Sequence, residues 1–583
     1  MWSIALKSQS LEKNKTASSE KFPFLIILLW AGAFLANVKS IFADYDVDMS
    51  YAVVTSYRHL SGERMFMEMW EPHQTSAFLL DPLMWIFSKI TGGYDGIIIF
   101  LNISGVILYA LLAAFLVQTL KKHTDPYVAH LAGIAVFAFR VRQIVLPEFT
   151  NMLSGFSILL IIFLIKHFEK KTDRLWLVLS ALALCLTVLS YPSAVVNYIA
   201  VCLCIFMFSE SKIKDFVILT CVCAAAGLMY LFYFAGHAGG LGTFSDNLKN
   251  IVSGDSSHNS EYAFDMLFYM KEVLAGAAWF AISAIAAFIV SFAVCAVFRK
   301  RKAVVFPAVF GGFLIITDLT FCIFFDNVIR TGSLRYVYGN LSLLLIVTAV
   351  FGLKKCNDFE KKMQLIAIFI SVSNMLSVIL LTNMELITAV QYLIPAGALS
   401  LISVSRLMAA ADKEKASGAG FSYAFVFLAV LTIVMHRGII MKDYSGVCKS
   451  VLGIEGIVKN GPAKGVVCSY MASYMARCNE EDWNRFVSPG ENVLVVASNL
   501  YDPIVYCFNS SSVSHYSTID TPTYDETLLK YWELYPDNYP DVIAVECWYG
   551  DMHVEEDSWI MNWVESSSDY IGDGSYYRFY RVR

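Results

Sequence analysis

Apolar residues along this chain gather into long runs that are separated by polar segments. Most runs are about 17–25 residues long, which is the length an α-helix needs to cross a hydrocarbon layer of roughly 30 Å. By run length we count about 13 candidate spans. They lie at residues 22–42, 97–119, 127–141, 150–166, 175–190, 194–208, 215–235, 270–297, 303–324, 339–353, 363–382, 386–405 and 421–436. The pattern predicts an α-helical polytopic membrane protein.

The polar connections between the runs alternate in charge. Counted from a cytoplasmic N-terminus, each inside connection carries a cluster of Lys and Arg, as short cytoplasmic loops do. The clusters fall at residues 121–122, 166–174, 212–214, 299–302, 354–362 and 413–415. Because the outside connections carry acids and aromatic residues instead, we expect residues 1–21 to be a cytoplasmic leader. The region after the last span should then lie outside.

Two outside segments precede the middle of the chain. In the first, residues 43–96, apolar residues recur every three or four positions between Met49 and Leu60, which predicts an amphipathic helix along the membrane interface. A second short helix is expected at 77–90. The other segment, 236–264, is rich in Gly, Ser and Asn and reads as a mobile loop.

Residues 437–583 differ from the multispan domain at 22–436. Strand-like runs at 493–497, 504–508, 542–546 and 576–582 alternate with helical stretches such as 525–534. This alternation predicts an extracytoplasmic α/β domain. Five of the 13 cysteines fall in this domain, an odd number whose pairing the sequence does not give.

Composition agrees with a membrane protein. Of the 583 residues, 57% are hydrophobic and 16% are charged, and the mean hydropathy is +0.56. Soluble domains are typically about 45–50% apolar and about 25% charged. The net charge of -5 comes largely from the C-terminal region, and no basic patch suggests a nucleic-acid partner. We expect a plasma membrane, and a bacterial one in the absence of a retention signal.

The most informative polar segment follows the first span and reads Asp44-Tyr45-Asp46-Val47-Asp48. In an extended segment, alternate residues share one side, so the three carboxylates would face the same way. Crowded carboxylates raise at least one pKa, which suits a general base. They could equally hold a divalent cation such as Mg or Mn through Asp46 and Asp48. The simpler alternative is a solvated acidic loop or a structural calcium site.

Further polar residues follow in the same outside segment. The predicted helix opens with Asp48-x-x-Tyr51 and leads to Gly62, after which comes Glu71-Pro72-His73. Glu71 adds an acid and His73 adds an imidazole that titrates near neutral pH. Both residues are candidates for substrate binding.

This order of features resembles the GT-C glycosyltransferases, a family of multispan enzymes that use sugars carried on polyprenyl phosphate. The resemblance is strongest over the first span and its loop, and it extends in general architecture over 22–436. In that family an Asp of the first outside loop acts as catalytic base or orients the acceptor, which implies this role for Asp46 or Asp48. The family often has adjacent acids, whereas they alternate here, so Asp44 also stays a candidate.

A second feature precedes the span at 339–353. The segment Arg330-Thr331-Gly332-Ser333-Leu334-Arg335-Tyr336 is similar to a recurring Arg-Tyr feature of the same family. Because a guanidinium matches two phosphate oxygens at once, Arg330, Arg335 and Tyr336 are candidates for binding the lipid phosphate. An interfacial anchor for the helix end is an equally weighted alternative.

A third feature is Arg140-Val141-Arg142 followed by Pro147-Glu148 in the second outside loop. Arginines outside run against the positive-inside trend. Arg142 and Glu148 are therefore candidates for substrate binding, with anion binding the reason for the arginine. Pairing with Glu148 or with the first-loop acids is the slightly favoured alternative.

Three hypotheses of function follow. The first is a hexosyl- or pentosyltransferase that moves a sugar from a polyprenyl-phosphate carrier to a glycan, lipid or protein acceptor at the outer face of the bilayer. The second is a transporter or flippase, which would need ionisable groups near the bilayer midplane. Asp318 is the clearest such group. An inactive protein that anchors the C-terminal domain is a third hypothesis.

Overall fold

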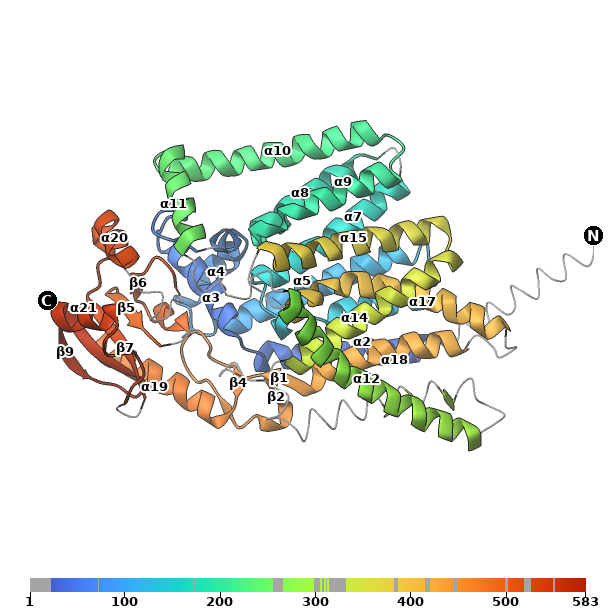
Figure 1. The fold of residues 1–583 in the computed structure, drawn as a ribbon. Helices are drawn as coiled ribbons and strands as arrows, with labels where there is room; N and C mark the ends of the chain where they lie inside the picture. Colours follow the sequence, from blue (N-terminus) through green and yellow to red (C-terminus); the bar gives the residue numbers. More distant parts are fainter. Residues whose placement is uncertain are drawn as a thin grey trace, which may run out of the picture.

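A computed structural model gives the fold. It describes residues 22–71, 73–170, 173–254, 266–297, 332–381, 386–414, 420–443, 448–498, 502–517, 526–548 and 551–583, and three two-residue pieces at 305–306, 309–310 and 312–313. Long helices lie side by side, and the C-terminal domain sits at one end of them (Figure 1).

Every predicted span apart from 303–324, which lies almost wholly outside the described residues, coincides with a helix. These helices are α2 (Phe22–Ala43), α5 (Ile97–Leu120), α6 (Pro126–Ala138), α7 (Phe149–Glu169), α8 (Leu175–Ser190), α9 (Asn197–Phe208), α10 (Lys212–His237), α12 (Met266–Val297), α14 (Gly332–Gly352), α15 (Asp358–Leu381), α17 (Ile394–Glu414) and α18 (Gly420–Ile439). By length and composition, six helical segments in the described part of the chain can cross a membrane. The expected number of about 13 spans stays a prediction.

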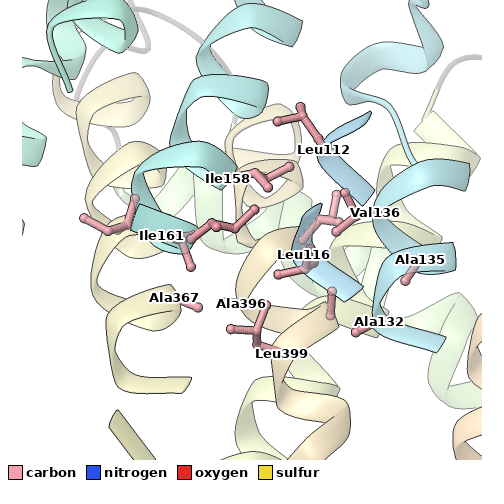
Figure 2. Packing of buried hydrophobic residues seen from close by; sticks show 14 of the residues in the cluster. Leu112, Leu116, Ala132, Ala135, Val136, Ile158, Ile161, Ala367, Ala396 and Leu399 are labelled. Atoms are coloured by element: carbon pink, nitrogen blue, oxygen red, sulfur yellow. The ribbon is translucent and has the colours of Figure 1, made fainter. Parts of the chain in front are cut away.

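The buried centre of the helices is built from small and branched apolar side chains. Leu112 and Leu116 of α5 lie near Ile158 and Ile161 of α7, and alanines of α6, α15 and α17 lie around them (Figure 2). Small residues allow helix backbones to approach closely, which is the usual basis of helix packing in a membrane. Gly133 of α6 is one such position, since an added Cβ would lie 2.3 Å from Val117 of α5.

The first outside segment forms two helices, α3 (Val47–Leu60) and α4 (Ala77–Thr91). The predicted helix at 49–60 is confirmed, but it does not present a single apolar stripe. Nine of its residues, from Met49 to Arg58, are buried, polar side chains such as Thr55 among them. The C-terminal domain encloses α3, which a helical stripe alone does not reveal.

The segment expected as a mobile loop at 236–264 contains a helix instead, α11 (Leu241–Gly254). Phe244 and Ile251 are buried on one face of α11, and the amide of Asn247 donates a hydrogen bond to the Phe66 carbonyl at 2.6 Å. Long-range contacts with the first outside segment therefore order a stretch whose composition favours a loop.

The C-terminal domain is a mixed α/β unit. Its main sheet has the order β6 (Ser511–Ser512), β5 (Asn492–Val496), β7 (Val542–Trp548), β10 (Tyr577–Val582) and β9 (Ser568–Asp573). β5 lies parallel to β7, and β10 is antiparallel to β7. Three predicted strands are thus confirmed, whereas 504–508 is wrong, because a 3-10 helix, η8 (Pro503–Cys507), occupies it.

The two faces of this sheet pack on different partners. Along β5, Val493 and Val495 join a cluster with α19 (Tyr470–Phe486), α3 and α4, while Leu494 and Val496 join a cluster with α20 (Glu526–Leu534) and α21 (Trp559–Ser567). This alternation is the period of two that a strand imposes. One face of the sheet therefore holds α3 against the helices. Cys478, Cys507 and Cys547 are unpaired and buried.

The last span leads straight into the domain. Strand β1 (Ile440–Lys442) begins at the residue after α18 and pairs antiparallel with β2 (Cys448–Ser450). α2 and α18 pack against each other, so the end of α2 lies beside β1. The acid segment that follows α2 therefore meets the start of the C-terminal domain.

Candidate functional site

The acid segment does not remain extended through all three carboxylates. Asp46 is the N-cap of α3, and its side chain accepts a hydrogen bond from the backbone N–H of Asp48 at 3.0 Å. Asp48 lies in the first helical turn, where a negative charge interacts favourably with the helix dipole. The cap turns Asp46 and Asp48 toward the second outside loop, whereas Asp44 lies before the helix.

Arg142 binds both of these acids. One terminal nitrogen of its guanidinium contacts Asp48, and the other lies 3.6 Å from Oδ1 of Asp46. Asp46 is fully buried, and the side chain of Asp48 is 20% exposed. The predicted pairing of Arg142 with the first-loop acids is therefore present in the structure, and two of the three acids converge on one guanidinium.

The backbone that carries Arg142 is strained. Arg142 and Gln143 have φ values of 56° and 67°, in the left-handed region that residues other than glycine rarely adopt. Each such residue costs about 1–3 kcal/mol and persists only where its surroundings fix it. Arg142 and Gln143 are two consecutive residues of this kind, and they lie opposite the acid segment. Contacts with the surrounding structure therefore hold this turn in a backbone conformation that is locally unfavourable.

Neighbouring elements hold the strained turn in place. The backbone N–H of Arg142 donates to Oε1 of Gln391 at 2.9 Å, and the guanidinium of Arg437 donates to the carbonyl of Gln143 at 2.7 Å. The loop then passes directly over α5 at Gly105, where an added Cβ would lie 1.9 Å from the carbonyl oxygen of Val145. A glycine is needed at this close approach.

Three further cations that meet the acids come from parts of the chain that the sequence analysis does not single out. Lys442 of β1 places its ammonium on Oδ2 of Asp46. Arg437, near the end of α18, lies 3.5 Å from Oδ2 of Asp44, and Lys39 of α2 lies 3.1 Å from the same atom. Arg437 and Lys442 lie at the C-terminal end of the last span, which we expect to be outside. Cations at an outside end run against the positive-inside trend, so the sequence holds a signal for them.

Asp44 also accepts a hydrogen bond from the backbone N–H of Lys442 at 2.9 Å, while the N–H of Tyr45 donates to the carbonyl of Lys442 at 2.9 Å. This pair of backbone contacts joins the acid segment to β1 almost as a strand would. The acid segment and the cation of β1 are therefore positioned by the same short element.

Glu148 does not contact the acid segment but caps α7. Its carboxylate accepts hydrogen bonds from the backbone N–H groups of Thr150 at 2.6 Å and Asn151 at 2.7 Å. Burial raises the pKa of Glu148 above its ordinary value, while these hydrogen bonds and the charge of Arg142 act in the opposite direction. Glu148 thus fixes the end of the loop that carries Arg142.

Glu71 belongs to a buried ionic network. One carboxylate oxygen accepts from Arg58 at 2.8 Å, and the other accepts from the hydroxyl of Thr55 at 3.1 Å. Ser517 of the C-terminal domain also donates to Glu71, at 2.5 Å. Burial works to lower the pKa of Arg58, but the charges of Glu63 and Glu71 outweigh it and raise the pKa. The role proposed for Glu71 in substrate binding stays a prediction.

His73 lies among aromatic rings next to the second loop. Its ring stacks on Phe149 with centroids 4.3 Å apart and lies 4.5 Å from the ring of Tyr191. Phe149 follows Glu148 directly, so His73 is near the loop. Its proposed role in substrate binding also stays a prediction.

Arg330 lies outside the described residues, as do the side chains of Arg335 and Tyr336. These three expectations stay predictions. Within the described part of the chain, the cations that meet the acids are Lys39, Arg142, Arg437 and Lys442.

The arrangement does not fit a divalent cation. Both oxygens of Asp46 face protein cations, and Arg142 also contacts Asp48. A metal ion would have to displace these groups. Among the residues that the structure describes, no three His, Cys, Asp or Glu side chains converge as metal ligands.

No family model matches the sequence, and no curated protein is similar enough to count as a relative. Among solved structures, the chain is similar to the oligosaccharyltransferase of Archaeoglobus fulgidus tethered with an acceptor peptide, at 12% identity and a TM-score of 0.44, over 95% of this chain and 74% of that one. It is also similar to AglB of the same organism in complex with an inhibitory peptide and a dolichol-phosphate, at 11% identity and 0.43, over 90% and 70%.

A third similar structure is ArnT from Cupriavidus metallidurans bound to undecaprenyl phosphate, at 11% identity and a TM-score of 0.43, over 95% of this chain and 97% of that one. AglB and ArnT are both GT-C glycosyltransferases. At such low identity and TM-score the likeness assigns no activity to this chain, so its function is inferred from its own contacts.

Proposed function

We propose that the chain is a membrane glycosyltransferase that moves a sugar from a polyprenyl-phosphate carrier to an acceptor at the outer ends of its helices. The observation that carries the proposal is the strained turn at Arg142, which holds one guanidinium against both Asp46 and Asp48. Strain of this kind gathers at functional sites. A guanidinium held by the buried Asp46 and the partly exposed Asp48 is suited to exchange one of these carboxylates for a bound anion.

The exchange would use groups already in place. A phosphate binds a guanidinium through two parallel hydrogen bonds, so the phosphate of the donor would compete with Asp48 for Arg142. Lys442, on Asp46, would stabilise the same phosphate by charge. Once released from Arg142, a carboxylate is free to accept a proton.

The transfer step then balances simply. The acceptor hydroxyl attacks the anomeric carbon, the bond from that carbon to the phosphate oxygen breaks, and the phosphate leaves with the electron pair. The hydroxyl proton passes to Asp46 or Asp48, and the cations neutralise the charge that grows on the leaving phosphate. General-base catalysis of this kind contributes about 10²–10⁴-fold to a rate.

A small apolar pocket lies among the helices. Side chains of α6, α14, α17 and α18 line it, among them Phe139, Leu345, Ile394 and Ile433. Phe139 stands three residues before Arg142 in the chain. The apolar side chains around this pocket are ones against which a polyprenyl tail would pack.

The contacts favour this function over a transporter. The charged pairs around Arg142 lie at helix ends and in the outside loops. Deeper polar contacts join neutral side chains, such as Asn197 with Asn374 at 2.6 Å and Asn374 with Ser157 at 2.8 Å. A transporter is expected to place ionisable groups there. Asp318 lies outside the described residues.

The test replaces Asp46 and Asp48 separately by Asn in the full chain, with Asp246→Asn as matched control because Asp246 is an exposed acid paired only with a surface lysine. Transfer is assayed from undecaprenyl-phosphate-linked hexose and pentose donors. We expect at least one site variant to lose about 10²–10⁴-fold in rate and the control to keep it. Full transfer in both site variants would overturn the proposed role of the acids.

A binding measurement separates the donor site from the chemistry. Undecaprenyl phosphate, which carries no sugar, is titrated against the wild type, Arg142→Ala and Arg64→Ala by native mass spectrometry. Arg64 is a matched control because it pairs with Glu68 on the surface. Weaker binding in Arg142→Ala alone is expected, and equal binding in all three chains would contradict a phosphate site at the turn.

A further inference from the structure

A group of apolar side chains stands exposed on the C-terminal domain. Leu452 is 74% exposed, Ile457 49% and Tyr470 64%, and Ile454 and Met471 are exposed beside them. We call these five residues the apolar rim. Isolated exposed apolar residues are ordinary, but a contiguous group marks an interaction surface.

The segments that carry the rim lie side by side. Strand β3 (Gly456–Ile457) pairs antiparallel with β4 (Val467–Cys468), so Ile457 lies opposite Val467, three residues before Tyr470. Gly456 approaches α19 so closely that an added Cβ would lie 2.5 Å from the hydroxyl of Ser473. The segments that carry the five exposed side chains are therefore neighbours.

The chain path places this surface at the outer end of the last span. β1 leaves α18 at Ile440, and the antiparallel β2 returns so that Ser450 lies opposite Ile440. Leu452 follows two residues later, in the short helix η7 (Val451–Gly453). At about 3.3 Å per residue, Leu452 is within roughly 10 Å of the point where α18 ends.

Contacts with α5 and with the residue after β1 also hold the apolar rim close to the ends of the spans. The N–H of Gly96 donates to the carbonyl of Gly461 at 2.9 Å, and the N–H of Ile98 donates to the carbonyl of Pro462 at 3.2 Å. The β3–β4 connection thus rests on the start of α5, a helix long and apolar enough to cross a membrane. Ser469, which caps α19, bonds to Asp443 next to β1, with its N–H 2.8 Å from Oδ1.

The chemistry of the rim matches a lipid surface. The boundary between head groups and acyl chains accommodates tyrosine and aliphatic side chains together. Lys459 and Lys464 are exposed on the same β3–β4 hairpin, where their charges can meet lipid phosphates. The ends of two spans, α18 and α5, support the rim from different sides. The rim therefore lies close to the membrane surface, and the membrane is the partner that it can reach.

We propose that the apolar rim inserts into the outer interfacial layer of the membrane that the helices span, and so holds the C-terminal domain on the bilayer surface. Inserted side chains would restrain the β1–β2 hairpin, which also carries Lys442 to Asp46. The bilayer would thereby help to keep the ammonium group of Lys442 in contact with Asp46. This inference depends on the membrane location and not on the sugar-transfer reaction.

The test measures lipid contact at single residues through the quenching of a fluorescent label by labelled lipid. Leu452→Cys and Ile457→Cys are labelled with a thiol-reactive NBD fluorophore in the full chain, with Ile571→Cys as matched control. Ile571 is a partly exposed aliphatic residue on β9, at the end of the domain away from the helices (Figure 1). Wild-type chains labelled in parallel give the background from native cysteines. The chains are placed in nanodiscs of phosphatidylcholine with or without doxyl-labelled phosphatidylcholine.

We expect doxyl lipid to lower the fluorescence at positions 452 and 457 by about twofold, because an inserted side chain sits within roughly 5–10 Å of the acyl boundary. The label at 571 should be unaffected. Equal quenching at 452 and 571, whether strong or absent, would overturn the proposal. Blue-shifted emission at 452 that doxyl lipid leaves unquenched would also overturn it, because a protein surface such as a second copy would then cover the rim.

Discussion

The hydroxyl of Tyr45 donates a hydrogen bond to Oδ2 of Asp502 across 2.7 Å. Tyr45 stands between Asp44 and Asp46 and is 1% exposed. Asp502 caps η8 of the C-terminal domain, where its side chain accepts from the N–H of Ile504. A single residue inside the acid segment thus connects the site to the outer domain.

Replacing Tyr45 by Phe removes this connection without changing the ring. Hydrogen bonds to charged groups contribute about 1.5–3 kcal/mol. We expect the turnover rate of sugar transfer to fall by about 10–100-fold, with a smaller change in KM for the donor, because Tyr45 positions the acids and does not meet the lipid. Steady-state kinetics measures both.

The matched control for this variant is Tyr57→Phe. The hydroxyl of Tyr57 also reaches the C-terminal domain, at 3.4 Å from the carbonyl of Ser510, but it lies on α3 away from the acids. A loss of rate in Tyr57→Phe as large as in Tyr45→Phe would show that general domain contact, and not the acid segment, is responsible.

Arg142→Lys tests the bridging guanidinium. A lysine has one ammonium group and cannot contact Asp46 and Asp48 through two separate nitrogens as arginine does. We expect donor affinity and transfer rate both to fall, each by about tenfold or more, since a charge-assisted hydrogen bond is lost. Arg64→Lys, at an exposed pair with Glu68, should leave both unchanged. Normal kinetics in Arg142→Lys would rule out bidentate binding at the turn.

Glu71→Gln tests the buried network for stability. Removing one partner of a buried pair costs about 3–5 kcal/mol, and Arg58 would keep only part of its compensation, from Glu63. We expect the midpoint of thermal unfolding to drop by several degrees. Glu481→Gln breaks the exposed pair with Arg477, where the cost is about 0–1 kcal/mol. Equal midpoints in the two variants would contradict a structural role for Glu71.

Glu148 should make stability depend on pH in a definite direction. Its pKa is raised in the folded chain above the ordinary value of 4.5. The folded state therefore holds this proton to higher pH than the unfolded state does. The resulting stability is fully present below pH 4.5 and is lost as pH rises through the folded pKa.

Glu148→Gln removes this proton, so the fall in the unfolding midpoint from pH 4.5 upward should become shallower than in the wild type. Asp573→Asn is the control, because the ion pair with Arg578 lowers the pKa of Asp573 below 3.8, and its contribution changes only at lower pH. Identical slopes for the wild type and Glu148→Gln would show that the carboxyl titrates alike in both states.

Chelation tests whether a metal ion binds at the acid segment. Since Arg142 and Lys442 already contact Asp46, sugar transfer should persist after EDTA treatment and should not rise when Mg or Mn is added back. The measurement is the initial rate of transfer before and after chelation. A rate that EDTA abolishes and Mn restores would mean that the cations of the site move aside for a metal.

Much of the helical architecture follows from local pattern. Run length predicts α2, α5 and α7 within a few residues, because a long apolar run has few other ways to satisfy its backbone in a membrane. Strand-like apolar runs at 493–497 and 542–546 likewise predict β5 and β7. The run at 504–508 is a helix because Pro503 and the Asp502 cap favour a turn there.

The site was predicted only in part. Its acids were found from their crowding, and Arg142 from its unusual place outside the membrane. Lys442 and Arg437 lie some 400 residues away in the chain, and their contacts with Asp46 and Asp44 depend on how α2 and α18 pack. A pattern within one segment holds no information about such a pairing. The left-handed backbone of Gln143 likewise results from contacts with Arg437.

The direct passage from α18 into β1 has a consequence for the environment of the reaction. Lys442 stands three residues beyond the end of the last span, with no linker to absorb movement. A helix whose apolar length differs from the thickness of its bilayer tilts to compensate. Such a tilt would shift the ammonium of Lys442 relative to Asp46. The acyl-chain length of the host lipids should therefore affect the rate of sugar transfer. The rate should be highest in bilayers whose hydrocarbon thickness matches the apolar length of α18.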